Sequence, residues 1–234
     1  MPDILGKYVK EIETTFGETL KAVILFGSKA GGRDVDKNSD HNLLVLLDKV
    51  IPDQLSLLAP PTKKWVKEGN PAPVIFSVSE FLGSADVFPI EYIDMKNTHR
   101  LLFGRDFLAE TEVNDKHLRH ECEFELRSKL LKLRQSYLTL KSHKNEIRNV
   151  LTGSISSFLV LFKHTVKLLG EAQPVMKIDS LNVLSKRTGL RPDVFTNIYK
   201  MKHGDKQIQK LDPEKLMEEY MLEIEKVITV VDNI

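Results

Sequence analysis

The first 110 residues alternate between helical and strand-like hydrophobic patterns. Ile4, Val9, Ile12 and Phe16 are spaced like one face of a helix, which Gly17 is expected to end. Short apolar runs rich in branched side chains predict four strands, at residues 22–26, 43–47, 74–76 and 88–93. We expect these strands to form one mixed sheet with helices on one face. Two glycines and several charged residues between residues 29 and 39 indicate a loop, and Pro-containing segments punctuate residues 60–71.

From about residue 112 the pattern is almost wholly helical. Asn114 or Asp115 can cap a long helix that runs toward Ser142, and a second helix is expected from about Glu146 to Leu169. Three further helices are predicted from residue 180 to Gly189, from Pro192 toward Gly204, and from the Asp212-Pro213-Glu214 cap onward. Five helices with short connections are typical of a bundle. The predicted fold class is therefore α+β, with a mixed-sheet domain at residues 1–110 followed by an all-α helical bundle at residues 111–234.

Composition narrows the class of protein without naming a function. Apolar residues make up 41% of the chain, enough to bury a core, and the formal net charge is only +1. A balance of this kind gives no global electrostatic argument for nucleic acid or an anionic membrane. The single cysteine, Cys122, excludes an intramolecular disulfide. No secretory signal opens the sequence, and the apolar run at residues 158–162 is far shorter than the roughly 20 residues of a membrane span. We expect a cytoplasmic protein with no membrane partner.

One segment carries a pattern suited to phosphate and metal chemistry. The strand at residues 22–26 runs into Gly27-Ser28, and Asp40 and Asn42 open the strand at residues 43–47. Gly27 has no Cβ to keep a ligand from the backbone, and Ser28 offers a hydroxyl and an N–H at the start of a helical turn. Alternation along a strand places Asp40 and Asn42 on the same side and His41 on the other. Two oxygen ligands on a rigid strand suit Mg²⁺, which also takes water and substrate phosphates as ligands.

This segment resembles the nucleotidyltransferase superfamily, including its aminoglycoside and minimal nucleotidyltransferases. The family pattern is an apolar strand, Gly-Ser, a loop, and Ser-Asp-x-Asp before a second apolar strand, with a third carboxylate on a later strand. Gly27, Ser28, Ser39 and Asp40 match it. Residues 88–94, followed by residues 101–106, resemble the third-carboxylate strand and the hairpin after it.

The resemblance implies transfer of a nucleoside monophosphate from a nucleoside triphosphate to an acceptor hydroxyl. Gly27 and Ser28 would hold the triphosphate, and Asp40 and Asn42 would hold Mg²⁺ or Mn²⁺. Glu91, ahead of Asp94, would be the third ligand or the base. The helical domain would supply acceptor contacts, and a homodimer is a further expectation of the resemblance. The acceptor itself is not indicated.

The chain departs from the family pattern at Asn42, which stands where the family has its second aspartate. An amide oxygen can bind Mg²⁺ but carries no charge, so every charge-stabilising role of the metal is weakened. The alternatives are a weakened enzyme, a catalytically inactive nucleotide-binding or protein-interaction module, and a component that modifies another protein. A second Asp-x-Asp, at Asp34 and Asp36, lacks a following apolar strand and is interpreted as a solvated loop.

Basic residues gather on the first two predicted helices of the second half, at Lys129, Lys132, Arg134, Lys141, Lys144 and Arg148. The default interpretation is a solvated helix face, and the rarer one is a basic wall facing the phosphate site.

Overall fold

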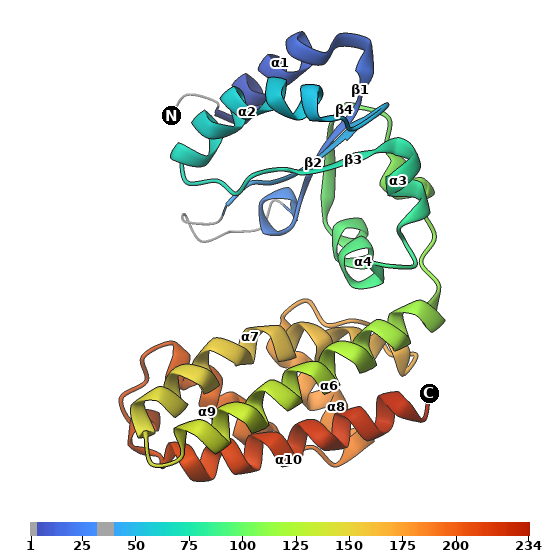
Figure 1. Ribbon diagram of the computed structural model, residues 1–234. Helices are drawn as coiled ribbons and strands as arrows, with labels where there is room; N and C mark the ends of the chain where they lie inside the picture. The colour runs from blue at the N-terminus through green and yellow to red at the C-terminus, as the bar shows by residue number, and fades with distance from the viewer. Residues whose placement is uncertain (1–3, 32–39) are drawn as a thin grey trace. The chain divides into compact units, whose positions relative to one another are not determined.

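The computed structural model describes residues 4–31 and 40–234, which divide into two compact units, Met1–Asn114 and Asp115–Ile234 (Figure 1). The division falls a few residues beyond the boundary expected at residue 110.

The first unit is built on a mixed sheet whose four described strands lie in the order β3-β2-β1-β4. The strands are β1 (Leu20–Phe26), β2 (Asn42–Leu47), β3 (Val74–Ser77) and β4 (His99–Gly104). β1 pairs antiparallel with β2 and β4, while β2 pairs parallel with β3. The first three strands confirm the sequence prediction, and the mixed sheet is confirmed with them.

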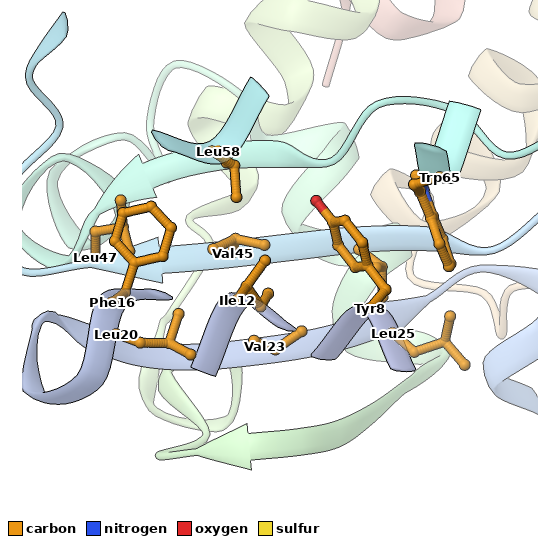
Figure 2. Close-up of a cluster of buried hydrophobic side chains, with 11 residues drawn as sticks. Tyr8, Ile12, Phe16, Leu20, Val23, Leu25, Val45, Leu47, Leu58 and Trp65 are labelled. Carbon is orange, nitrogen blue, oxygen red and sulfur yellow. The ribbon is translucent and has the colours of Figure 1, made fainter. Parts of the chain in front are cut away.

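Helices cover both faces of this sheet, so the expectation of helices on one face was wrong. On one face, α1 (Ile4–Phe16) and α2 (Pro52–Lys67) pack side chains such as Ile12, Leu58 and Trp65 against β1 and β2 (Figure 2). On the other face, α3 (Val78–Gly83), α4 (Pro89–Asn97) and α5 (Phe107–Glu110) pack against the same two strands. The reason is visible in β2, where every residue from Leu43 to Leu47 is buried. A strand with no polar alternation needs apolar cover on both sides.

Residues 88–93 were predicted as a strand, and this prediction was wrong because they enter the α4 helix. Pro89 occupies its first turn, where a proline ring fixes φ at a helical value and no N–H is needed. Ile90, Tyr92, Ile93 and Met95 are buried, so this short helix is covered around most of its circumference. The fourth strand is instead β4, within the segment whose resemblance was to a hairpin.

The α2 helix was not predicted, since Pro60 and Pro61 lie in its interior. Each proline removes one N–H donor from the helical ladder, which is unfavourable in isolation. Burial of Leu58, Pro61 and Trp65 against the sheet compensates for this cost.

The second unit contains five α-helices of more than one turn, as the sequence predicted. They are α6 (Asp115–Leu140), α7 (Lys144–Leu168), α8 (Ser180–Thr188), α9 (Pro192–Lys202) and α10 (Pro213–Asp232). Gly189 ends α8 in the left-handed conformation at φ 68°, and the Asp212 carboxylate caps α10 by accepting from the Glu214 N–H. No strand occurs in residues 115–234, all of which the structure describes.

The core of this bundle contains a cluster of aromatic rings. Phe162 and Tyr220 both meet Phe195 edge to face, with ring centroids 5.1 and 5.2 Å apart. Such contacts fix neighbouring helices more specifically than aliphatic packing does. None of the helices in the described ranges is long and apolar enough to cross a membrane.

Candidate functional site

The predicted metal-binding residues lie at the start of β2, where the strand meets the end of β1. Asn42 is the first residue of the strand and pairs with Phe26. Asp40 precedes it and is exposed, whereas the Asn42 side chain is partly buried. Paired residues of neighbouring strands share a face, so Asn42 lies on the face covered by α3, α4 and α5.

His41 lies on the opposite side of the strand, as expected from alternation. Its backbone N–H donates to Asn70 Oδ1 at 3.1 Å, and its ring Nδ1 is 3.0 Å from the same oxygen. The ring is tilted against Trp65 of α2, with centroids 5.9 Å apart. These contacts give His41 a structural role and leave it no part in the Asp40–Asn42 site.

Gly27 is held against Asn42 and has a backbone that only glycine adopts without strain. Its φ is +79°, and a Cβ built on it would lie 3.3 Å from Asn42 Nδ2. Its N–H donates to the Thr98 carbonyl oxygen at 2.9 Å, which ties the end of β1 to the residue before β4. The Gly27 N–H is therefore already used, and the glycine serves to bring the chain close to the Asn42 amide.

The short helical turn predicted at Ser28 is present as the 3₁₀ turn η2 (Ser28–Gly31). Its first bond runs from the Ala30 N–H to the Gly27 carbonyl oxygen at 3.0 Å. The N–H groups of Ser28 and Lys29 precede that bond and have no acceptor within the turn. Ser28 is also exposed.

The strand on the far side of β1 carries basic residues at the level of the site. His99 pairs with Phe26 and Arg100 with Leu25, so Asn42, Phe26 and His99 form one row across three strands. β4 reads HRLLFG and contains no acid. The sequence prediction did not include His99 or Arg100, because it placed the strand of the third carboxylate earlier in the chain, at residues 88–94.

His99 is held by two acceptors and so is not a free catalytic group. Its Nε2 lies 3.0 Å from Asp106 Oδ2, and its Nδ1 lies 3.1 Å from the Lys96 carbonyl oxygen. Asp106 also caps α5 by accepting from the Ala109 N–H at 3.1 Å. Burial alone would raise the pKa of Asp106, but these hydrogen bonds and the His99 charge outweigh it and lower that pKa. The pair joins β4 to α5.

Glu91 lies on the helix α4. The expectation that it lies on the strand of the third carboxylate was therefore wrong. Glu91 is exposed in the first helical turn, where an acid is stabilised by the helix dipole. Asp94 follows one turn later and is partly buried. The second Asp-x-Asp, Asp34 and Asp36, lies outside the described residues, as does Ser39.

Asp40 and Asn42 are the described side chains of the candidate site that could bind Mg²⁺. Residues 4–31 and 40–234 contain no group of three or more His, Cys, Asp or Glu side chains arranged to hold a metal. Asp40 offers one carboxylate and Asn42 one neutral oxygen beside it. Mg²⁺ commonly binds one or two protein oxygens and fills its octahedron with water and phosphate oxygens.

Three of the six residues in the basic stretch across α6 and α7 pair with acids. Lys129 pairs with Glu125 at 3.1 Å, Arg134 with Glu225, and Lys144 with Asp212 at 3.4 Å. These pairs fit the interpretation of a solvated helix face. Arg148 contacts uncharged groups, the Asn145 side chain and the Gln209 carbonyl oxygen.

Comparison with known proteins identifies the fold class that this geometry belongs to. No protein-family model matches the sequence, and no curated protein matches it. Among solved structures, the chain is similar to an aminoglycoside adenyltransferase, a member of the nucleotidyltransferase superfamily. That protein is the spectinomycin adenyltransferase AAD(9) from Enterococcus faecialis, solved with ATP and spectinomycin. The TM-score is 0.57 at 14% identity, over 98% of each chain. At this identity the likeness shows that the two chains share a fold.

Proposed function

We propose that this chain binds a nucleoside triphosphate and transfers its nucleoside monophosphate slowly to an acceptor hydroxyl. The observation that carries the proposal is the junction of β1 and β2, where Gly27 at φ +79° lies against Asn42 and Asp40 stands exposed beside them. The solved neighbour of the same fold holds ATP, which supports a nucleotide as the donor. Its spectinomycin makes an aminoglycoside-type antibiotic the first acceptor to test.

Each residue has a role that its position allows. Ser28 and the N–H groups that open η2 bind the triphosphate, and Gly27 keeps that approach clear of side chains. Asp40, with the Asn42 oxygen, holds Mg²⁺ or Mn²⁺, which when bound neutralises charge on the phosphates and polarises the phosphoryl group. Glu91 remains the candidate for the third acid, now on α4, and Asp94 is its alternative.

A second candidate function is nucleotide binding without catalysis, and the sequence of β4 favours it. The family pattern has a carboxylate on a later strand, yet β4 contains no acid, and His99 lies in the row of Asn42. His99, whose ring nitrogens meet Asp106 and the Lys96 carbonyl oxygen, does not complete a metal centre or remove a proton from an acceptor. On this view the chain senses a nucleotide or acts on a partner protein, and a homodimer is one assembly in which it would do so.

Calorimetry and a turnover assay on the same protein separate these functions. ATP, CTP, GTP and UTP are titrated with and without Mg²⁺ or Mn²⁺, and pyrophosphate release is followed with spectinomycin and other hydroxyl acceptors. We expect weak binding of one or more nucleotides and slow release of pyrophosphate that Asp40→Asn abolishes. Binding without release supports the second function. No binding of any nucleotide contradicts both, and tight binding with fast transfer contradicts the view that Asn42 weakens the site.

A further inference from the structure

A cavity of about 600 Å³ lies in the helical unit, far along the chain from the residues of the nucleotidyltransferase site. It is formed by the first turns of α7, the last turn of α9 and the 3₁₀ turn η4 (Ile208–Lys210), with α7 and α9 packed side by side (Figure 1). Its polar lining includes Asn145, Arg148, Asn149, Lys202 and Gln209. A volume of this size is in the range of small-molecule sites, which are about 300–1,000 Å³.

The lining of the cavity is cationic. Arg148 and Lys202 are its charged residues, and no acid is among the lining residues. Neither cation forms an ion pair with a carboxylate anywhere in residues 4–31 and 40–234. Lys144, one turn before Arg148 on the same helix, does form such a pair, with Asp212. The two positive charges of the cavity are therefore not neutralised by the protein.

Arg148 is held by two hydrogen bonds from its terminal nitrogens, and further N–H donors remain, including the buried Nε. Its Nη1 donates to Asn145 Oδ1 at 3.0 Å, and its Nη2 donates to the Gln209 carbonyl oxygen at 3.2 Å. Its Nε is buried and meets no hydrogen-bond acceptor among the described residues. A guanidinium fixed in this way loses little further side-chain freedom when an anion binds. The Lys202 ammonium donates to Ser156 Oγ at 2.7 Å, a single bond that leaves it two more donors.

Gly153 in the interior of α7 keeps part of the cavity wall open. Glycine is unfavourable inside a helix, yet this one has no positive φ to require it. A Cβ placed on it would meet no atom within 4 Å, so close packing does not require it either. The residue lines the cavity, and the space next to it would be reduced by any larger side chain. Gly153 is thus unfavourable for the stability of α7. It lies at the position where the missing side chain leaves space for a ligand.

We propose that this cavity binds a small phosphorylated polyol, such as a sugar phosphate. A phosphate monoester carries a charge of about −1.5 to −2 at neutral pH, which matches the two unpaired cations better than a carboxylate does. The amides of Asn145, Asn149 and Gln209 supply donors and acceptors for the hydroxyl groups of the ligand. The site lies wholly within residues 115–234, so it shares no residue with the proposed nucleotide site in the first unit.

Calorimetry on the full chain tests this assignment with ribose 5-phosphate, glucose 6-phosphate and glycerol 3-phosphate, and with ribose and inorganic phosphate as partial ligands. We expect at least one phosphorylated polyol to bind at least 10-fold more tightly than inorganic phosphate or ribose. Lys202→Met should weaken that binding at least 10-fold while keeping an aliphatic stem, and Gly153→Leu should abolish it by filling the space. Lys200→Met is the matched control, because Lys200 is an exposed lysine on α9 outside the cavity lining, and its affinity should equal that of the wild type.

Three results would overturn the proposal. The first is failure of all three phosphorylated polyols to bind. The second is inorganic phosphate binding as tightly as they do, since the cavity would then recognise an anion alone. The third is binding that Lys202→Met leaves unchanged, which would place the ligand elsewhere, including at Ser28. Circular dichroism of each variant shows that it is folded, and Lys202→Met decides the outcome should Gly153→Leu not fold.

Discussion

In the proposed function, the single residue Asn42 sets how strongly the first unit binds a metal ion. Our proposal gives Asn42 the position of the second aspartate in the nucleotidyltransferase pattern, and an amide has almost the shape of that carboxylate. What changes is charge, because an amide oxygen binds Mg²⁺ as a dipole and contributes nothing to the neutralisation of phosphate oxygens. On this proposal, Asn42 preserves the shape of the site and weakens its binding of metal.

Restoring the acid should restore metal binding. Without metal, Asn42→Asp should lower the melting temperature, because two nearby carboxylates repel each other. Titration with Mg²⁺ should recover that loss and stabilise the variant more than the wild type, since a ligand that binds only the folded state favours it. Thermal melting across a Mg²⁺ series is the measurement. Equal stabilisation of the two proteins by Mg²⁺ would show that the site is not a degraded metal centre.

The same titration identifies the third acid. Asn42→Asp combined with Glu91→Gln should lose the gain in Mg²⁺ stabilisation, whereas Asn42→Asp combined with Asp94→Asn should keep it. The opposite result would transfer the role to Asp94, which lies one turn further along α4. If both double variants keep the gain in Mg²⁺ stabilisation, Asp40 and the carboxylate introduced at position 42 bind the metal with water as the other ligand.

Gly27 should be intolerant of even one methyl group. Gly27→Ala incurs the strain of a left-handed residue, about 1–2 kcal/mol, and also places a methyl 3.3 Å from Asn42 Nδ2. Gly69→Ala is the matched control, since Gly69 has a similar φ of +88° and open space around it. Chemical denaturation should therefore show a larger loss of unfolding free energy for Gly27→Ala. Equal losses would indicate that Asn42 moves aside without cost.

At the scale of elements, the sequence was most informative where the chain marks its own helix ends. The Asp212-Pro213 cap and Gly189 place two helix boundaries correctly, because side-chain capping and positive φ are local effects. The prediction of a strand at residues 88–93 was wrong because a short, largely apolar run fits a buried strand and a short helix equally well. The helix α2 was missed because its stability comes from tertiary burial that offsets Pro60 and Pro61. The Asp40–Asn42 pair was predicted from local spacing, whereas His99 lies in the same row as Asn42 through strand pairing between residues far apart in sequence.

Glu223 of α10 holds the start of α9 in a way that sequence reasoning did not reveal. It is 3% exposed and accepts from the Arg191 N–H at 2.9 Å and from Arg191 Nε at 3.0 Å. Lys226 Nζ donates to it as well, at 3.0 Å. Burial alone would raise the pKa of Glu223, but these donors outweigh burial and hold that pKa below its ordinary value of 4.5.

Neutralising Glu223 should destabilise the bundle in a pH-dependent way. Glu223→Gln should cost about 1–2 kcal/mol of unfolding free energy at pH 7, since charged hydrogen bonds are lost. A carboxylate whose folded pKa is lowered stabilises the protein above its unfolded pKa and ceases to do so as the pH falls through the folded pKa. The difference between wild type and variant should therefore shrink below about pH 4. Denaturant melts from about pH 3 to 7 measure it.

Glu219→Gln is the control for that series. Glu219 lies one turn away on α10 and meets Arg191 Nη2 at 3.5 Å from a more exposed position. Its loss should change the unfolding free energy by about 0.5 kcal/mol or less. Similar costs for the two variants would show that burial gives Glu223 no special role.

At the scale of the whole molecule, the division at Asn114 gives each unit its own core. The sheet of the first unit is buried between two helical layers, and the bundle of the second closes on its own aromatic rings. We therefore expect a fragment of residues 115–234 to fold without the rest of the chain. Its circular dichroism should be strongly helical and its melting cooperative. A fragment that melts without a cooperative transition would show that the bundle depends on the first unit.

Trp65 gives the protein an optical marker on one unit alone. It is the single tryptophan of the chain, it is 2% exposed, and its ring is stacked on Tyr8 of α1 with centroids 4.7 Å apart. The bundle contains no tryptophan, so tryptophan emission does not report on its unfolding. Far-ultraviolet dichroism, in contrast, is dominated by the long helices α6, α7 and α10. Emission and dichroism recorded on one sample thus follow the sheet unit and the bundle separately, with no label added.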